Sequence, residues 1–205
     1  AIDDSIRHCI TKLSQLHFTA TEEYRRRVIQ LGENPKNVFN VGAIGIDNIK
    51  NIKLLNKKSF EDKIKFKLNK KNILLTFHPE TLEKDNGISQ FKEILKFVST
   101  LQDTNIIFTK SNADEGAFEI NKLIDKYVAK NNKNTIVFKS MGKLLYFSSL
   151  QFVDAVVGNS SSGIIEVPSF KIGTINIGNR QKGRILANSV INCEANNKSL
   201  KKAFE

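Results

Sequence analysis

Short polar segments that directly follow apolar runs contain the side chains with which this sequence can do chemistry. The first segment, residues 75–80, holds His78. A histidine there can act as an acid or base near neutral pH, or donate a hydrogen bond to a phosphate. A turn histidine bonded to backbone is the alternative. In the second segment, residues 112–116, Asn112 or Asp114 can bind a ligand, but capping of the following helix is the commoner role.

The third segment, Gly-Asn-Ser-Ser-Ser-Gly over residues 158–163, predicts an anion site. Backbone N–H groups and the positive end of the following helix can point at a phosphate. Because the helix dipole supplies only about 0.3 to 1 kcal/mol, the hydroxyls of Ser160 and Ser161 and a cation elsewhere must add to it. Glu166 would repel phosphate but can accept two hydrogen bonds from a ribose diol. A flexible serine loop is the alternative interpretation.

The fourth segment, residues 178–184, can supply the positive charge that a phosphate site needs. Arg180 or Arg184 suits this role, since a guanidinium matches the geometry of a phosphate group. Each segment alone is weak evidence. Ligands of open parallel sheets bind outside the carboxyl ends of the strands, where all four segments are expected to lie. Together they predict a nucleotide site.

The elements that must position these segments follow from the alternation of short apolar runs with amphipathic ones. This alternation predicts an α/β fold, a Rossmann-like doubly wound sheet that is mostly parallel. The expected strands are residues 72–77, 105–108, 135–138, 153–157, 174–177 and 190–193. The expected helices are residues 88–101, 117–128, 143–150 and 163–169, with a last helix after the final strand.

Residues 1–48 predict the end of another domain. A helix capped by Asp3 or Asp4 precedes a strand, a second helix that begins at Thr21, and a second strand. Two strands cannot make a stable parallel sheet by themselves, so the beginning of this domain is expected to be missing. The single methionine is Met141, which also indicates that the natural N-terminus has been lost.

The positive charge is concentrated in one segment. The net charge is +11, and residues 50–71 contain nine lysines against two carboxylates, Glu61 and Asp62. Arginines and aromatic residues are not interleaved there, as a stacking surface for nucleic acid requires. We therefore expect residues 49–71 to form a solvated lysine-rich connector with a short helix that starts near Ser59. We expect no nucleic-acid partner.

Amino-acid composition excludes several other classes of protein. Hydrophobic residues make up 40% of the 205, which excludes a fully disordered chain. No apolar run approaches the ~18 to 20 residues of a membrane helix. With only Cys9 and Cys193 there is no disulfide framework, and no leader opens the chain, so a reducing, cytoplasmic location is expected. No metal site is expected, because His8, His17 and His78 lack ligand spacing with the cysteines.

The sequence resembles the hydrolysing UDP-N-acetylglucosamine 2-epimerases of bacterial sialic acid biosynthesis. The matching stretches, in family order, are Asp-Asp-Ser-Ile-Arg-His at 3–8, Phe-His-Pro at 77–79, Asn-x-Asp-x-Gly at 112–116, Gly-Asn-Ser-Ser-Ser-Gly-x-x-Glu-Val at 158–167 and Gly-x-Arg-Gln-x-Gly-Arg at 178–184. The last two motifs together are highly specific, and the resemblance covers almost the whole chain.

The resemblance implies a GT-B type arrangement of two Rossmann-like domains. Residues 1–48 would then be the C-terminal remnant of the first domain, 49–71 the connector, and 72–205 the nucleotide-binding domain, truncated before its last helix. Truncation at both ends implies that this fragment alone is inactive.

The family's reaction eliminates UDP across C1–C2 of the sugar to a glycal, and water then adds to release N-acetylmannosamine. The resemblance implies catalytic roles for Asp3, Arg7 and His78. It implies UDP-binding roles for Asn112, Ser160, Ser161, Glu166 and Arg180. It implies no cofactor, a UDP-sugar substrate, no membrane partner, and a homo-oligomer (dimer or tetramer) in the intact enzyme.

Four alternatives remain. The same reaction can act on a UDP- or GDP-linked diacetamido-bacillosamine, and the enzyme can be of the non-hydrolysing type. The chain can also be a GT-B glycosyltransferase or a non-catalytic UDP-binding module. Non-hydrolysing enzymes usually carry Pro-Glu-Glu-x-x-Arg where this chain has Ile-Asp-Asp-Ser-Ile-Arg at residues 2–7, which favours hydrolysis.

Overall fold

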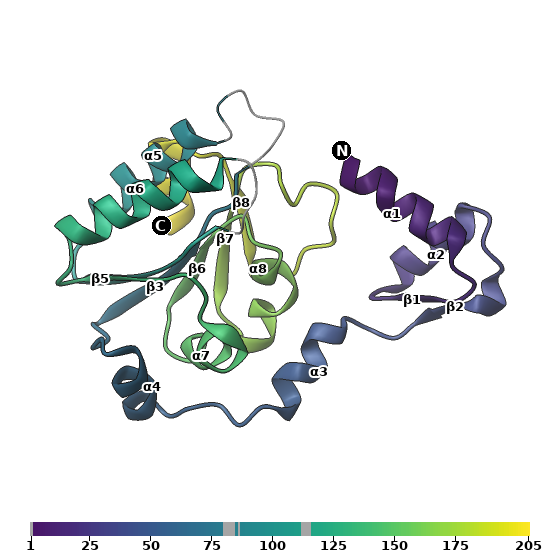
Figure 1. The fold of residues 1–205 in the computed structure, drawn as a ribbon, viewed down its shortest axis with the longest axis horizontal. Helices are drawn as coiled ribbons and strands as arrows, with labels where there is room; N and C mark the ends of the chain where they lie inside the picture. The colour runs from purple at the N-terminus through teal and green to yellow at the C-terminus, as the bar shows by residue number, and fades with distance from the viewer. Residues whose placement is uncertain (1, 80–84, 86, 112–115) are drawn as a thin grey trace. The chain divides into compact units, whose positions relative to one another are not determined.

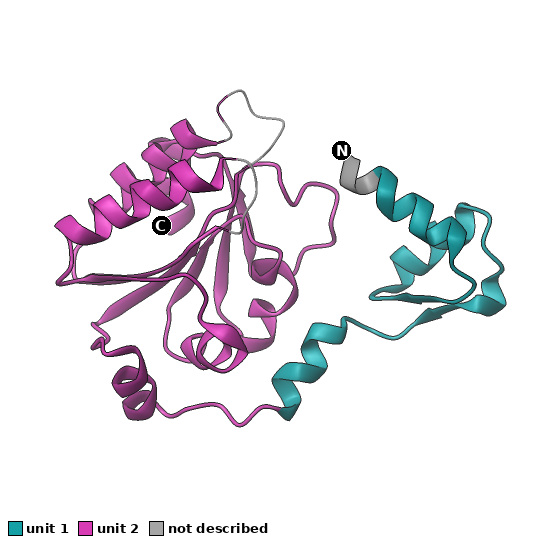
Figure 2. Cartoon of the chain, viewed as in Figure 1, with its two compact units in different colours: residues 1–51 teal, residues 52–205 magenta. Residues whose placement is uncertain are grey.

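In the computed structural model the chain divides into two compact units, residues 1–51 and 52–205 (Figure 2). The structure describes residues 2–79, 85, 87–111 and 116–205, with the backbone alone for residues 2–4.

The larger unit is built on a parallel sheet with the strand order β5-β4-β3-β6-β7-β8 (Figure 1). Its strands are β3 (Lys71–Thr76), β4 (Thr104–Thr109), β5 (Thr135–Phe138), β6 (Ala155–Gly158), β7 (Gly173–Ile177) and β8 (Val190–Cys193). At the carboxyl end of β3, Thr76 lies opposite Thr109 of β4 and Gly158 of β6. This is the doubly wound Rossmann order, and it confirms the parallel α/β sheet predicted from the sequence.

Helices cover both faces of this sheet. On one face lie α5 (Ile88–Val98), α6 (Ala117–Lys130) and α9 (Asn197–Phe204), and on the other lie α7 (Gly142–Ser149) and α8 (Ser162–Ile165) (Figure 1). Strands buried on both faces need nearly continuous apolar runs, which is why β3 and β4 read as Ile-Leu-Leu and Ile-Ile-Phe. The largest fully buried core side chains include Phe77, Phe91, Ile94, Phe108, Ile120 and Ile124.

The helix predicted over residues 163–169 is divided in the structure. The α-helical part, α8, ends at Ile165, and a 3-10 turn, η2 (Val167–Phe170), continues the chain. Pro168 has no backbone N–H and cannot extend an α-helical ladder, which accounts for the change in helix type.

The smaller unit contains a two-stranded parallel sheet. Its elements are α1 (Ile2–Leu13), β1 (His17–Thr19), α2 (Glu22–Gln30), η1 (Pro35–Asn37), β2 (Val38–Asn40) and α3 (Ile44–Asn51). The second helix starts beside Thr21, as predicted, and Thr21 is its cap, since its hydroxyl oxygen accepts a hydrogen bond from the N–H of Tyr24 at 3.2 Å. Because α1 begins at Ile2, the cap predicted at Asp3 or Asp4 was wrong, and α3 was not predicted.

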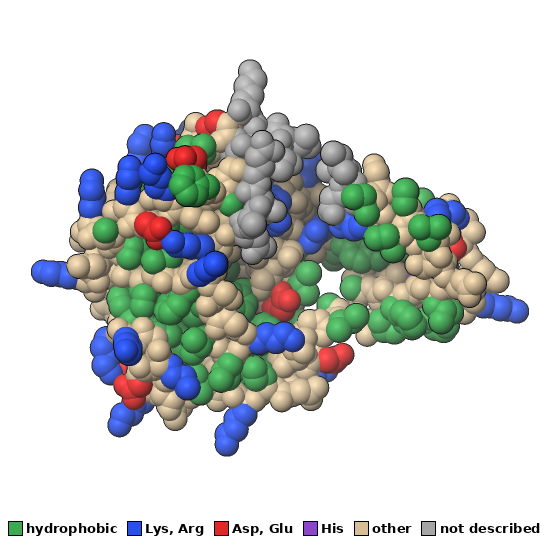
Figure 3. All heavy atoms as spheres, viewed as in Figure 1, with side chains coloured by type: hydrophobic (Ala, Val, Ile, Leu, Met, Phe, Trp, Pro, Cys, Tyr) green, Lys and Arg blue, Asp and Glu red, His purple; other side chains and the backbone are tan. Residues whose placement is uncertain are grey.

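Much of the apolar surface of the smaller unit is uncovered. The rings of Phe18 and Phe39 stack on each other across β1 and β2, yet both are exposed. On α1 the apolar side chains of Ile6, Ile10 and Leu13 are exposed as well. Hydrophobic side chains accordingly show on the surface of this unit in Figure 3. This unit has no large core of its own among the described residues.

The lysine-rich segment is folded onto the larger unit. Helix α4 (Lys57–Ile64) buries Phe60 against Phe152, with ring centroids 5.6 Å apart, and the N–H of Leu55 donates to the Ser148 hydroxyl at 3.0 Å. All nine lysines of residues 50–71 are exposed. The short helix predicted near Ser59 starts at Lys57, and the side chain of Asn56 is its cap, since it accepts from the Ser59 N–H at 2.9 Å.

Candidate functional site

The centre of the candidate site lies where β3 and β6 adjoin, at the carboxyl edge of the sheet. The chain leaves β3 toward α5 on one face and leaves β6 toward α8 on the other. This reversal is the topological switch point at which doubly wound sheets bind their ligands. The loops that begin with His78 and Ser160 therefore start next to each other, although 82 positions separate them in the sequence.

Asn159 joins these two loops. It is fully buried, and its side chain bonds the backbone of His78 twice: Oδ1 accepts from the His78 N–H at 2.7 Å, and Nδ2 donates to the His78 carbonyl at 2.8 Å. Its own N–H donates to the carbonyl of Thr76 at 3.2 Å. His78 is itself only 7% exposed. The backbone that carries the predicted active-site histidine is thus held in place by one amide side chain.

The loop after β7 attaches to the same residue. The guanidinium of Arg180 donates to the carbonyl of Asn159 at 3.2 Å, and the side-chain amide of Gln181 donates to that carbonyl at 2.7 Å. Gln181 is buried and Arg180 is largely exposed. The structure therefore brings Arg180 to the start of the serine loop, where the sequence analysis required a cation.

The serine loop itself turns into a helix of one turn. Ser160 and Ser161 are half-buried, and the Ser160 hydroxyl accepts from the N–H of Ser162 at 3.4 Å. The carbonyls of Ser160 and Ser161 accept from the N–H groups of Gly163 and Ile164 at 3.2 and 3.1 Å. Hydroxyls and a guanidinium at one strand edge can bind a phosphate.

Glu166 follows one turn after Ser162, whose carbonyl accepts its N–H at 3.0 Å. Its Oε2 is buried and has no hydrogen-bond partner among the described residues. The hydroxyl of Tyr146, on α7, is within 2.5 Å of the Ser162 hydroxyl. Burial raises the pKa of Tyr146 to about 12, and the nearby Glu166 charge acts in the same direction. A buried, unbonded carboxylate oxygen suits a ligand that brings hydroxyl donors.

Sequence reasoning missed Asn159 and Tyr146. Asn159 stood inside the quoted serine motif, and an amide side chain directly after a buried strand was the available indication. Tyr146 is an ordinary aromatic residue in a helix, so nothing in the local sequence distinguished it.

The remaining predicted site residues belong to other segments of the chain. Asp3 and Arg7 belong to α1 of the smaller unit, where Arg7 is exposed. Asn112 lies outside the described residues. Within the described residues no three His, Cys, Asp or Glu side chains group together as a metal ion would need. No helix in the described ranges is long and apolar enough to cross a membrane.

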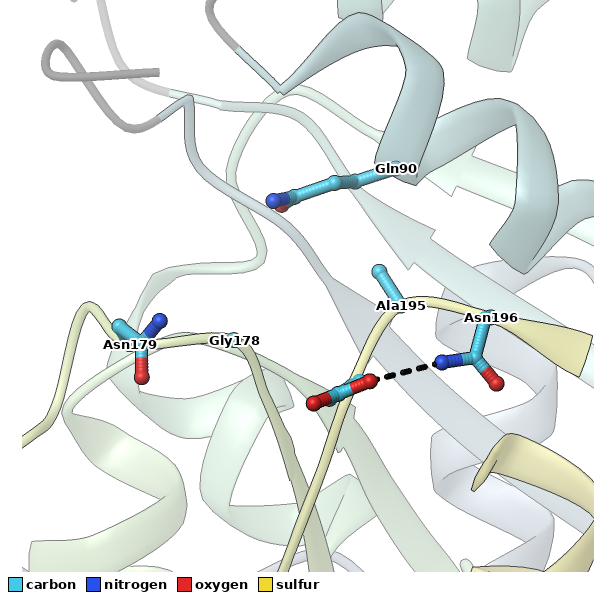
Figure 4. Close-up of a pocket in the computed structure, with 6 residues that line it drawn as sticks. Gln90, Gly178, Asn179, Ala195 and Asn196 are labelled. Carbon is cyan, nitrogen blue, oxygen red and sulfur yellow. Dashed lines mark hydrogen bonds between the residues drawn. The ribbon is translucent and has the colours of Figure 1, made fainter. Parts of the chain in front are cut away.

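A separate recess of about 290 Å³ opens beside the loop after β7 (Figure 4). It is lined by Gln90, Gly178, Asn179, Glu194, Ala195 and Asn196. In it the Asn196 amide donates to the Glu194 carboxylate at 3.0 Å. None of the predicted site residues lines this recess in the part of the chain that the structure describes.

Comparison with known families decides which proteins this chain is related to. The family model described as UDP-N-acetylglucosamine 2-epimerase matches residues 1–205. The chain belongs to the UDP-N-acetylglucosamine 2-epimerase family. The resemblance noted in the sequence is therefore confirmed.

Curated relatives of this epimerase-family chain carry related names. A Campylobacter jejuni protein named GDP/UDP-N,N'-diacetylbacillosamine 2-epimerase (hydrolyzing) is 46% identical over 205 residues, which are 100% of this chain and 53% of that protein. The Escherichia coli polysialic acid biosynthesis protein P7 is 45% identical over 92% of this chain and 48% of its own length. This chain spans about half the length of these relatives.

Solved structures show the same fold. The S. aureus MnaA–UDP co-structure has a TM-score of 0.70 at 16% identity, over 95% of this chain and 51% of that one. The UDP-GlcNAc 2-epimerase from Methanocaldococcus jannaschii has a TM-score of 0.70 at 20% identity, over 95% of this chain and 55% of that one. These likenesses in fold confirm the Rossmann-like α/β fold class predicted from the sequence.

Proposed function

We propose that this chain is part of a hydrolysing nucleotide-sugar 2-epimerase that releases UDP and N-acetylmannosamine from UDP-N-acetylglucosamine. The observation that carries the proposal is the meeting of His78, the serine loop and Arg180 at the switch point, in a chain 46% identical to a relative named as a hydrolysing 2-epimerase. UDP would leave by elimination across C1–C2 to a glycal, and water would add to the glycal.

Each predicted residue has a role in this proposal. Ser160, Ser161 and Arg180 bind the diphosphate and stabilise its charge as the C1–O bond breaks. Glu166 accepts hydrogen bonds from the ribose hydroxyls with its buried oxygen. His78 moves a proton at the sugar.

The roles of three further residues are proposed from the family resemblance alone. Asp3 is proposed as a catalytic carboxylate and Arg7 as its companion, while Asn112 is proposed to bind the nucleotide. The proposal needs no cofactor. It places the protein in the cytoplasm as a homo-oligomer, a dimer or a tetramer, without nucleic-acid or membrane partners.

A second substrate has support of its own. The Campylobacter jejuni relative and a Legionella pneumophila relative, 34% identical over 94% of this chain, are both named for N,N'-diacetylbacillosamine nucleotides. The chemistry at C1 and C2 is the same, because the two sugars differ at more remote ring positions. We therefore keep this substrate as the second candidate.

Binding of UDP to the 205-residue chain tests the site. Titration calorimetry should show binding that Ser160→Ala and Arg180→Ala each weaken roughly tenfold or more, as expected for lost hydrogen bonds to a charged group. Lys182→Ala is the matched control, since it removes an exposed positive charge from the same loop. Equal weakening by Lys182→Ala and Arg180→Ala would mean that general charge, and not the proposed contact, binds UDP.

Turnover tests the reaction. In a chimera, this chain replaces the matching half of the Campylobacter jejuni relative, and the products from both candidate substrates are identified by mass spectrometry. The proposal expects UDP and the free 2-epimeric sugar in equal amounts. An epimerised nucleotide sugar without free UDP would point to the non-hydrolysing reaction, and UDP binding without turnover to a non-catalytic module. His78→Ala should lower kcat far more than it weakens UDP binding.

A further inference from the structure

Asn159 is the residue through which the loops of the candidate site are connected. Its side chain bonds both the N–H and the carbonyl of His78, its N–H bonds Thr76, and its carbonyl accepts from Arg180 and Gln181. The five hydrogen bonds reach the ends of β3 and β7 from the end of β6.

We infer that Asn159 is a positioning residue that sets His78 and Arg180 at a fixed separation from each other. This inference rests on the proposed function, in which His78 acts on the sugar and Arg180 on the diphosphate. Elimination needs the proton-transferring group and the group that stabilises the leaving diphosphate in place at once, and small misplacements cost large factors in rate.

The pattern of bonds is what points to positioning. The oxygen and the NH2 group of a buried side-chain amide need hydrogen-bond partners wherever the residue lies. These partners can come from different residues. Asn159 instead bonds both backbone groups of one residue, which fixes the direction in which the His78 side chain leaves the backbone. Its own carbonyl, which points to the other loop, accepts from a guanidinium and an amide together.

Another buried asparagine provides the structural comparison. Asn105 is the second residue of the neighbouring strand β4, at the opposite, amino edge of the sheet, and its side-chain amide donates to the carbonyl of Lys67 at 2.8 Å. It is as buried as Asn159 within a few per cent, but its side chain bonds one backbone carbonyl of a loop and not both backbone groups of one residue. Asn105→Ala therefore reproduces the loss of a buried amide far from the candidate site.

The first test follows the His78 imidazole by NMR in the 205-residue chain with labelled histidine. Asn159→Ala should shift the His78 imidazole resonances and leave those of His8 and His17 in place. Asn105→Ala should lower the melting temperature without moving the His78 resonances. If the Ala variant does not fold, Asn159→Asp keeps the shape and one acceptor and should give a smaller shift. Unmoved His78 resonances in a folded Asn159 variant would overturn the inference.

The second test uses turnover in the chimera described above. Asn159→Ala should lower kcat on the order of 10- to 100-fold, and should add much less than this loss when combined with His78→Ala. Losses that multiply in the double variant would show a role independent of His78 and overturn the inference. A chimera without any epimerase activity would count against the proposed function, while the NMR result would still decide the role of Asn159.

Discussion

Single residues at the site differ in whether the protein itself supplies hydrogen-bond partners for their buried polar atoms. The side chain of Asn159 has partners at both ends, whereas Glu166 Oε2 is buried without one in the described part of the chain. Leaving a buried polar atom unbonded costs about 1–3 kcal/mol, so such an atom is expected where a ligand supplies the partner. Tyr146 lies close to this carboxylate, because its hydroxyl is 2.5 Å from that of Ser162 and the Glu166 charge helps to raise its pKa.

Tyr146→Phe tests this arrangement. Loss of the tyrosine hydroxyl removes the hydrogen bond that holds the Ser162 side chain in place, so UDP affinity should fall about 2- to 10-fold, equivalent to one ordinary hydrogen bond. Calorimetric titration measures the effect. Tyr127→Phe, the same change in α6, should leave UDP affinity unaltered. An equal loss in both variants would rule out a specific role for Tyr146.

Gly158 is required by backbone geometry. Its φ is +135°, and a Cβ at this position would lie 1.7 Å from the carbonyl oxygen of Thr76 on the adjacent strand. Gly158→Ala should therefore destabilise the larger unit by more than about 4 kcal/mol or prevent folding. Gly142→Ala is the control, since its φ is also positive but its Cβ would meet nothing within 4 Å. It should cost about 1 kcal/mol in chemical denaturation. Similar losses for both would contradict the close approach.

At the scale of elements, helix α4 shows how capping and packing together place the lysine-rich segment. Asn56 bonds the first turn, and Phe60 and Ile64 are buried against the larger unit. The exposed lysines add charge on the outside without taking part in these contacts. The segment is therefore solvated on one side only.

Capping of α4 by Asn56 is open to a direct test. Asn56→Ala should lower the free energy of unfolding of the larger unit by about 1 kcal/mol, the usual cost of a lost N-cap. Ser59→Ala should change it by less than about 0.5 kcal/mol, because the Ser59 side chain is not the cap. Urea denaturation of both variants gives the comparison, and the reverse order of losses would show that Asn56 is not the cap.

For the molecule as a whole, the two units differ in how much core they contain. The main hydrophobic cluster lies entirely between Ile73 and Phe204 in the larger unit. Among the described residues of the smaller unit, Val38 is the one buried hydrophobic residue, and the Phe18–Phe39 pair is exposed. A two-stranded sheet with an uncovered face is too small to be stable by itself.

The two units, prepared as separate polypeptides, should differ in whether they unfold cooperatively. Residues 52–205 alone should unfold cooperatively on heating, with a melting temperature close to that of the larger unit in the full chain. Residues 1–51 alone should show no cooperative transition, because their apolar side chains lack a core to enter. Circular dichroism of each piece, with the full chain as control, measures both. A cooperative transition in 1–51 would show that its own core suffices.

The amino-acid sequence by itself determined the alternation of strands and helices, because apolar periodicity and capping are local properties. It also determined the family and the four polar segments, since motif residues lie close together in the chain. The start of a helix at Thr21 was predictable for the same reason.

Only the tertiary structure decided how those segments are connected. The strand order brings β3 beside β6, and Asn159 then bonds His78 across 81 positions and Arg180 across 21. Gly158 is constrained by a carbonyl on another strand, and Tyr146 reaches Ser162 from another helix. Such contacts join residues that are far apart in the sequence and are brought together by packing. The periodicity of apolar residues along the chain therefore does not predict them.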